Sequence, residues 1–390
     1  MGRAARETGA AIVGIGQTEF SKDSGRSELQ LACECITAAL DDAGLAPRDV
    51  DGMSTFTIDN NEDVDLVRAL GVENLRFSSR VGHGGGGSVG PLAHAVAAVD
   101  SGQADVVVCW RAMNERSEYR FGTSQMGASR GQAGAGSGFI EWSLPFGAAS
   151  PAAWTSVQAA RYMHVYGVTN EDFGHVSVQL RKNASTNPNA WFYGKPITLA
   201  DHQASRWIVE PVFRLLDCTQ ESDGGVAVVV TSRERARDLR QPPVRIVGAT
   251  EAVPREFETV TSYYHDDLTR FAAGIACAKE LYGRTGLGPR DMQVAMLYDH
   301  FTIAVLWHLE AWGFCEPGEA AAFVKDGHIA LDGTIPVSPN GGHIGEAYIH
   351  GMNNIAEAVR QVRGTAANPV KDVEHVLVSA GMSGAILGRG

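Results

Sequence analysis

Short apolar runs alternate along the chain with longer segments of helical periodicity. Residues 11–14 (AIVG) and 245–248 (RIVG) each open such a unit and predict a buried strand. Apolar side chains then recur at helical spacing, through Leu29, Cys33, Ile36 and Leu40 in the first unit and through Leu268, Phe271, Ile275 and Leu281 in the second. Strands that alternate with helices predict parallel sheets covered by helices, and therefore an α/β protein.

The two units are copies of one longer pattern. The sequence LAPRDV at 45–50 is echoed by LGPRDM at 287–292. Two further stretches each hold a glycine turn, a helical pattern and an apolar run in the same order, at 82–108 and 341–378. We therefore predict two halves related by a pseudo-twofold axis, residues 1–240 and 241–390.

The first half carries a segment, about 111–214, that has no counterpart in the second. It is rich in Gly, Ser, Tyr and Trp and includes GQAGAGSG at 131–138. Long insertions in compact domains usually serve a function, so we interpret it as a cap or loop domain over a pocket, with helices near 152–166 and 170–183. A surface excursion without a ligand role is the alternative.

Composition narrows the class of protein. The chain has 390 residues, 44% hydrophobic and 20% charged, with a formal net charge of -12. These fractions argue against disorder, and the negative charge argues against a nucleic-acid surface. No stretch reaches the roughly 18 apolar residues of a membrane span, and the N-terminal segment is too rich in glycine for a signal peptide, so we expect a cytoplasmic protein.

The six cysteines are scattered without a CxxC pair. This spacing predicts neither a zinc site nor a disulfide framework, and most of the thiols are expected to be small buried groups. The run His265-Asp266-Asp267 is interpreted as a solvated turn because no further ligand lies at metal spacing. We expect no metal.

A first glycine turn, VGHGGGGSVG at 81–90, precedes a helix. Free backbone N–H groups at Gly85, Gly86, Gly87 and Ser88 would form a cradle for an oxyanion or another anion. GGSVG also matches the G-x-S-x-G elbow of serine hydrolases, but here it overlaps the HGGG motif that should lie on a separate loop. Serine hydrolysis is therefore the weaker alternative, and Ser88 is predicted to cap the helix.

A second glycine turn, PNGGHIGEAYIHG at 339–351, gathers an amide, a phenol and two imidazoles. Upstream, MLYDHF at 296–301 ends an apolar strand in polar groups, the usual place for catalytic side chains in open α/β sheets. The candidate catalytic residues are Tyr298, His300, Asn340, His343 and Tyr348. The alternative is that the tyrosines are packing residues and that His343 and His350 are satisfied core groups.

At these motifs the sequence resembles the thiolase superfamily, and the resemblance covers essentially the whole chain. The NGG turn is similar to the thiolase turn that leads to a catalytic histidine, whose position holds Tyr348. The YDHF run is similar to the H-D-C-F segment of sterol-carrier thiolases, with Tyr298 at its histidine. The two thiolase cysteines fall near Gly85 and at about Ser379, so both thiols are missing.

The resemblance implies a thiolase fold. In that fold two βαβαβαββ halves form a five-layer αβαβα sandwich with an inserted loop domain. Without a thiolate no acyl-enzyme can form, which excludes ordinary thiolase condensation. The pattern is similar to the lipid-transfer-protein-like aldolases of bacterial steroid side-chain degradation.

That branch implies retro-aldol cleavage of a β-hydroxyacyl-CoA. The expected substrate is a 17-hydroxy steroid with a C-20 carboxyl-CoA side chain, and the products are a 17-ketosteroid and propionyl-CoA. Tyr348 is expected to take the hydroxyl proton and Tyr298 to act as the paired acid, although the two roles can be exchanged. His300, His343 and Asn340 would orient them, and the turn from Gly85 to Ser88 would hold the enolate.

The resemblance also implies partners. We expect a homodimer, and a small OB-fold and zinc-ribbon protein that completes a heterotetramer. No cofactor is expected, because coenzyme A is part of the substrate. A non-catalytic subunit that binds acyl-CoA or sterol for a partner enzyme is the alternative from a different class.

Overall fold

The computed structural model describes residues 7–82, 85–118, 120, 144–255 and 266–390. Its helices and strands are β1 (Ala10–Gln17), α1 (Glu28–Ala43), β2 (Gly52–Phe56), α2 (Asp63–Leu70), β3 (Phe77–Val81), α3 (Gly90–Asp100), β4 (Val106–Asn114), α5 (Pro151–Tyr166), α6 (Asn170–Thr186), α7 (Leu199–Ala204), β5 (Trp207–Val209), β6 (Phe213–Arg214), β7 (Asp223–Ser232), α8 (Arg233–Ala236), β8 (Val244–Glu251), α9 (Ala272–Thr285), β9 (Val294–Leu297), α10 (Thr302–Ala311), α11 (Ala320–Lys325), α12 (Gly342–Gly345), α13 (Met352–Arg363), β10 (His375–Ser379) and β11 (Ser383–Arg389).

The larger sheet has nine strands in the order β3-β2-β4-β7-β1-β8-β11-β10-β9. The first five strands belong to the first half of the chain and the last four to the second half. Strand pairing between the halves within this sheet joins Ala11 with Arg245 and Ile12 with Val244. The two predicted sheets are therefore joined at one end, between β1 and β8.

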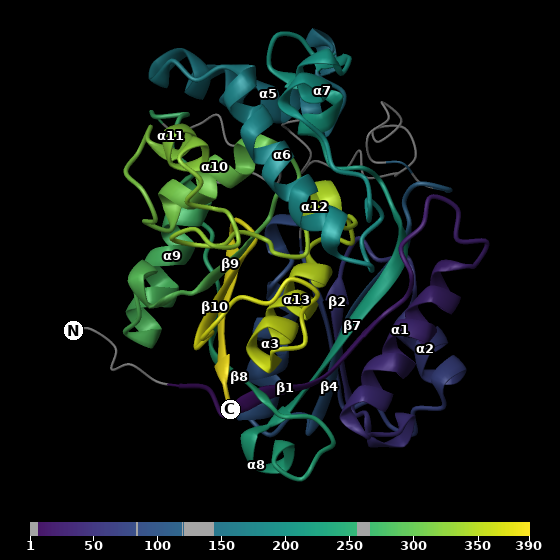
Figure 1. Cartoon of the computed structure of the whole chain (residues 1–390). Helices are drawn as coiled ribbons and strands as arrows, with labels where there is room; N and C mark the ends of the chain where they lie inside the picture. The colour runs from purple at the N-terminus through teal and green to yellow at the C-terminus, as the bar shows by residue number, and fades with distance from the viewer. Residues whose placement is uncertain (1–6, 83–84, 119, 121–143, 256–265) are drawn as a thin grey trace.

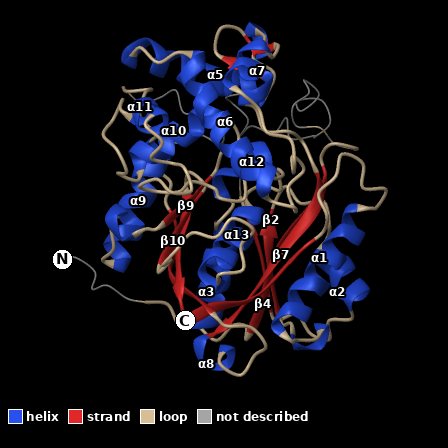
Figure 2. Cartoon of the chain, in the orientation of Figure 1, coloured by secondary structure: helices blue, strands red, loops and turns tan. Residues whose placement is uncertain are grey.

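Helices form three layers around these strands, as Figures 1 and 2 show. Helices α1 and α2 cover the outer side of the first half, and α9 and α10 cover the outer side of the second. Helices α3 and α13 lie between the two halves and contact strands of both. This arrangement confirms the predicted thiolase fold.

Strand β4 shows how sequence periodicity builds these layers. Val106, Val108 and Trp110 belong to the core cluster beneath α1. Val107 and Cys109 belong to the central cluster that contains α3 and α13. Successive side chains of a strand point to opposite faces, so an unbroken apolar run is what a strand covered on both faces requires. Helix α1 ends where predicted, before Gly44, whose φ of 75° is left-handed.

The second half differs from the prediction in one strand and in the start of one helix. Its third strand is reduced to one isolated bridge between Ala295 and Val337. Pro336 and Pro339 flank Val337 and have no N–H to donate, which limits the ladder. The helix that was predicted to pass through Phe271 begins one residue later, at Ala272.

Helices α5, α6 and α7 of the inserted segment lie at the top of the molecule in Figure 1, beyond β9. Strand β4 continues to Asn114 and β7 begins at Asp223, so the segment outside the repeat runs between them. Helices α5 and α6 correspond to the two helices predicted there, and α6 packs on α10, α11 and α12 of the second half. The glycine-rich run 131–138 lies outside the described residues.

Within the described chain, no helix combines the length and the apolar character that a bilayer crossing requires.

Candidate active site

Two tyrosine hydroxyls meet at the carboxyl end of β9. Tyr298 directly follows that strand, and its N–H donates to the carbonyl of Ser379 at 3.0 Å. Tyr348 lies in the loop between α12 and α13. The hydroxyl of Tyr298 donates to the hydroxyl of Tyr348, with 2.7 Å between the oxygens. The structure therefore brings together two of the predicted residues that lie fifty positions apart in the sequence.

The first glycine turn leaves room for this phenol. A Cβ atom at Gly85 would lie 1.6 Å from the Tyr298 hydroxyl oxygen. At Gly351 a Cβ would lie 2.4 Å from Ser88 Oγ and 3.2 Å from Cδ2 of Tyr298. Glycine turns of both halves thus meet around one ring. The tyrosine hydroxyl occupies the space into which a cysteine at position 85 would project.

Ser88 does not have the role predicted for it. Helix α3 begins at Gly90 with Val89 as its N-cap, so Ser88 is not the cap. Its N–H donates to the Gly85 carbonyl at 3.1 Å, which closes the turn and removes that N–H from the predicted cradle. Ser88 is 1% exposed. His83 and Gly84 of the same turn lie outside the described residues.

Asp299 holds the second glycine turn. Its carboxylate is fully buried and accepts the backbone N–H groups of His343 and Ile344, at 2.9 and 3.0 Å. Gly342 has a φ of 63°, and a Cβ there would lie 2.4 Å from the carboxylate. Asp299 was not among the predicted site residues, although it stands between two of them in the sequence.

His343 and Asn340 lie in this turn but make different contacts. The imidazole of His343 packs on the ring of Tyr298, with centroids 4.5 Å apart, and its Nδ1 is 3.0 Å from Asp299. The side-chain amide of Asn340 donates to Glu346 at 2.5 Å, and its carbonyl oxygen accepts the Gly342 N–H at 3.1 Å. The polar atoms of Asn340 are therefore engaged within the turn itself.

His300 packs on the other side of Tyr298, with ring centroids 5.2 Å apart. Burial lowers the pKa of His300 to about 4, because the apolar surroundings disfavour the imidazolium. This imidazole is neutral near pH 7. It therefore does not supply the positive charge that a tyrosinate would require.

That charge comes from Arg111, which sequence reasoning missed. The guanidinium is 1% exposed, pairs with Asp59 Oδ2 at 2.6 Å, and donates through Nε to His350 Nδ1 at 3.0 Å. His350 thus accepts at Nδ1 and carries its hydrogen on Nε2, and its ring lies 5.0 Å from that of Tyr348. The only sequence signal was an arginine inside the buried run of β4.

Burial raises the pKa of Tyr348 and that of Tyr298 above the usual range, because neither ionised form is well solvated. The negative charge of Glu115 raises both values further. The positive charge of Arg111 lowers the pKa of Tyr348. In the free protein the pair therefore consists of two neutral phenols, with one cation favouring ionisation at Tyr348.

Replacing Arg111 by methionine is expected to lower the free energy of unfolding by about 3–5 kcal/mol, because Asp59 would remain as a buried, unpaired charge. Chemical denaturation of the variant measures this loss. Arg284→Met is the matched control: its ion pair with Glu280 is exposed, and its loss should cost about 0.3–0.5 kcal/mol. Equal, small losses in both variants would contradict the account of Arg111.

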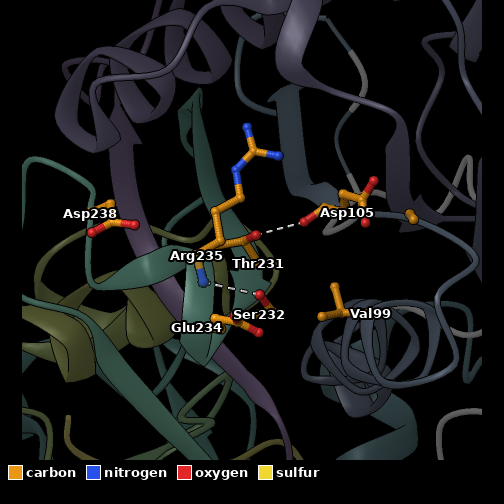
Figure 3. A pocket seen from close by; sticks show the side chains of 8 residues that line it. Val99, Asp105, Thr231, Ser232, Glu234, Arg235 and Asp238 are labelled. Atoms are coloured by element: carbon orange, nitrogen blue, oxygen red, sulfur yellow. Dashed lines mark hydrogen bonds between the residues drawn. The ribbon is translucent and has the colours of Figure 1, made fainter.

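A cavity of about 360 Å³ lies at the other end of the sheet (Figure 3). It is lined by Val99, Ala104, Asp105, Thr231, Ser232, Glu234, Arg235 and Asp238. None of the predicted site residues contributes to it, and its charged lining residues are three acids and one arginine. Within the described residues, no group of three or more His, Cys, Asp or Glu side chains is arranged to hold a metal ion.

The fold and the paired tyrosines define a thiolase-like protein. The family described as "Thiolase C-terminal domain-like" matches residues 256–387. The chain is 55% identical to the steroid side-chain-cleaving aldolase of Thermomonospora curvata, over 97% of both chains. It is 52% identical to the 17-hydroxy-3-oxo-4-pregnene-20-carboxyl-CoA lyase of Mycobacterium tuberculosis, over 97% of this chain and 99% of that one. The chain therefore belongs to the thiolase-like family that contains these two steroid enzymes.

Solved structures agree with this placement. The structure named Ltp2-ChsH2(DUF35) aldolase superposes with a TM-score of 0.93 and 53% identity, over 99% of each chain. Human mitochondrial 3-ketoacyl-CoA thiolase superposes with a TM-score of 0.68 at 15% identity, over 98% of this chain and 99% of that chain. The second likeness shows the shared fold alone.

Proposed function

We propose that the chain is a carbon-carbon lyase that cleaves a β-hydroxyacyl-CoA by a retro-aldol reaction. The proposed substrate is a 17-hydroxy steroid with a C-20 carboxyl-CoA side chain, and the products are a 17-ketosteroid and propionyl-CoA. The observation that carries the proposal is the hydrogen-bonded pair of tyrosine hydroxyls, of which that of Tyr298 fills the space that a side chain at position 85 would need. The two related steroid enzymes support the same reaction class.

The pair can complete the reaction without a net gain or loss of protons. Tyr348 is neutral in the free protein, so it must first release its proton to solvent. The phenolate then takes the proton of the 17-hydroxyl, the bond between C17 and C20 breaks, and the electrons of that bond form the thioester enolate. The Tyr298 hydroxyl protonates the α-carbon of that enolate and becomes ionised itself. Tyr348 then returns a proton to Tyr298 across the 2.7 Å hydrogen bond, which restores the starting state.

The surroundings support this division of roles. Arg111 favours ionisation at Tyr348, and Tyr298 is the donor in the hydrogen bond between the two hydroxyls. We assign the enolate oxygen to the turn at Gly85, Gly86 and Gly87, since the N–H of Ser88 is already used. The reaction requires no cofactor beyond the coenzyme A of the substrate. His300 and His343 enclose the Tyr298 ring and fix its position.

Incubation with a 17-hydroxy steroid acyl-CoA tests the proposal. Mass analysis should find 17-ketosteroid and propionyl-CoA in equal amounts when the chain is supplied with its partner. Binding of the acyl-CoA without release of ketone would instead favour a non-catalytic subunit.

Ser88 offers a separate test of the hydrolase alternative. Its hydroxyl is buried and packed at Gly351, so a fluorophosphonate should leave this serine unlabelled. Labelling at Ser88 in intact protein would support serine hydrolysis instead.

We also propose that the chain works in a complex. The related structure carries a second component in its name, ChsH2(DUF35), which supports a partner of that kind. An OB-fold and zinc-ribbon protein and a homodimer of this chain would together form a heterotetramer. Light scattering of the co-expressed proteins should give a mass of two copies of each chain, and a one-to-one complex would contradict this assembly.

A further inference from the structure

Glu346 is a buried carboxyl group that the proposed reaction does not use. It lies between α12 and α13, two residues before Tyr348, and is 1% exposed. Three side-chain amides donate to its oxygens: Asn187 to Oε1 at 3.1 Å, and Asn340 and Asn353 to Oε2 at 2.5 and 2.9 Å. A carboxyl group is costly to bury, and these amide donors compensate for the water that it loses.

The three amides belong to different segments of the chain. Asn340 lies at the start of the second glycine turn, Asn353 lies in the first turn of α13, and Asn187 directly follows α6 of the inserted segment. Asn353 also donates to the carbonyl of Ala347 at 3.1 Å. Asn187 also donates to the carbonyl of Asn340, at 3.1 Å. The loop that carries Tyr348 is therefore held before and after that residue by groups that converge on one carboxyl group.

Helix α6 supports the same turn directly. It packs on α12, and the two helices lie side by side in Figure 1. A Cβ atom at Gly341 would lie 2.5 Å from Cβ of Ala184, and one at Gly345 would lie 2.6 Å from the same atom. Glycine at both positions therefore allows the helix to approach the backbone of the turn closely. The N–H of Trp191 donates to the carbonyl of Glu346 at 2.9 Å. The inserted segment is thus joined to this turn by packing and by hydrogen bonds.

We infer that Glu346 is a positioning residue through which the inserted segment fixes the place of Tyr348, an inference that rests on the proposed function. Asn187 and Trp191 connect the insert to Glu346, and Asn353 connects Glu346 to α13. Tyr348 lies in the short loop between these contacts. A displacement of about 1 Å in a reacting group can cost on the order of 10² in rate, so this loop has to be held rigidly for the phenol to reach its proton. The insert is therefore part of the support of the site.

Glu346→Gln tests this role in the complex of the chain with its partner. The substitution keeps the shape of the side chain but replaces one acceptor oxygen by an NH2 group, which would face an amide that also donates. We expect kcat of cleavage to fall on the order of 10²-fold, because the loop would move until the two donors separate. KM should stay within about threefold of the wild-type value, since the loss concerns the placement of the base and not the binding of the substrate.

Asn187→Ala tests the contribution of the inserted segment. It removes one donor from Glu346 and leaves the other two amides in place, so kcat should fall by less, about tenfold. Because both substitutions act through the same contact, the double variant should be much faster than the product of the two losses predicts. Losses that multiply would show that Asn187 acts independently of Glu346 and would refute the inference. If Glu346→Gln does not fold, an unchanged kcat in Asn187→Ala refutes it alone.

Glu357→Gln is the matched control. Glu357 is 2% exposed, and its carboxyl group accepts from Gln361 at 2.8 Å and from Arg360 at 3.5 Å, both on its own helix α13. Its replacement perturbs a buried carboxyl group without changing the contacts of the Tyr348 loop, so kcat should stay within about threefold of the wild type. Equal losses of kcat in Glu346→Gln and Glu357→Gln, or an unchanged kcat in Glu346→Gln, would overturn the role of Glu346.

A second measurement does not depend on catalysis. In protein labelled with 3-fluorotyrosine, the fluorine NMR signal of Tyr348 is identified by its absence from Tyr348→Phe. This signal should shift or broaden in Glu346→Gln and in Asn187→Ala, and it should stay unchanged in Glu357→Gln. An unchanged signal in the first two variants would contradict the inference even if their activity is lost. A signal that responds as expected, together with a wild-type complex that cleaves no substrate, would place the failure in the proposed function alone.

Discussion

Replacing Tyr348 by phenylalanine is expected to lower kcat of cleavage by about 10²–10⁴, the usual contribution of a general acid or base. The substitution removes the proton acceptor of the reaction and the acceptor of the Tyr298 hydroxyl. The ring would remain packed against His343 and His350, so the fold should persist. Release of 17-ketosteroid, measured by mass spectrometry, checks the loss of turnover. The circular dichroism spectrum checks that the fold persists.

Tyr298→Phe should reduce turnover by a similar factor, because it removes the acid that protonates the enolate. Tyr282→Phe is the matched control: this partly buried phenol donates to the carbonyl of Trp312 and lies outside the site. Its loss should leave kcat unchanged. Near-normal turnover in both Tyr348→Phe and Tyr298→Phe would rule out the assignment of the pair.

Gly85→Ala is expected to reduce cleavage on the order of 10²-fold, as a displacement of about 1 Å in a reacting group can do. The added Cβ would lie 1.6 Å from the Tyr298 hydroxyl oxygen, so this phenol would have to move away from Tyr348. Gly85→Cys should lose the same activity and gain no thiolase activity, since its side chain needs the space that the phenol fills.

Gly82→Ala is the control for this position. Gly82 lies in the same turn, and a Cβ there would meet nothing within 4 Å. Steady-state rates of the two alanine variants should therefore differ widely. Equal rates in Gly82→Ala and Gly85→Ala would show that the hydroxyl of Tyr298 does not have to be where the structure places it.

Much of the fold was predictable because it depends on local periodicity. The repeated strand and helix patterns, the Gly44 helix end and the two helices of the insert follow from spacing alone. The shortening of the third strand in the second half was not predicted. It arises because Pro336 and Pro339 restrict the pairing of this segment to one bridge. Ser88 was interpreted as a cap because its residue type favours one, but the turn closes on Gly85 and the helix begins after it.

The site was predictable where its residues lie in one of the two polar clusters. Tyr298, His300, His343 and Tyr348 come from such clusters, and the fold brings them together. Arg111 was missed because it belongs to the first half and lies inside a buried strand. Its proximity to Tyr348 depends on how the two halves pack, which no local pattern reports.

The residue that supplies the positive charge near the tyrosine pair could be identified only from the structure. A nearby positive charge favours a phenolate, but burial keeps His300 neutral near pH 7, so this imidazole does not supply that charge. The cation is instead a guanidinium held between Asp59 and His350. Burial decides which of these groups is charged, and burial follows from the packing of the whole molecule.

Intact-protein mass spectrometry during turnover of the complex tests most directly whether two phenols break the carbon-carbon bond without tethering the acyl group. We expect 17-ketosteroid and propionyl-CoA to accumulate in equal amounts while the mass of the chain stays unchanged. A chain that gains the mass of an acyl group during turnover, or that releases no ketone when its partner is present, would contradict it.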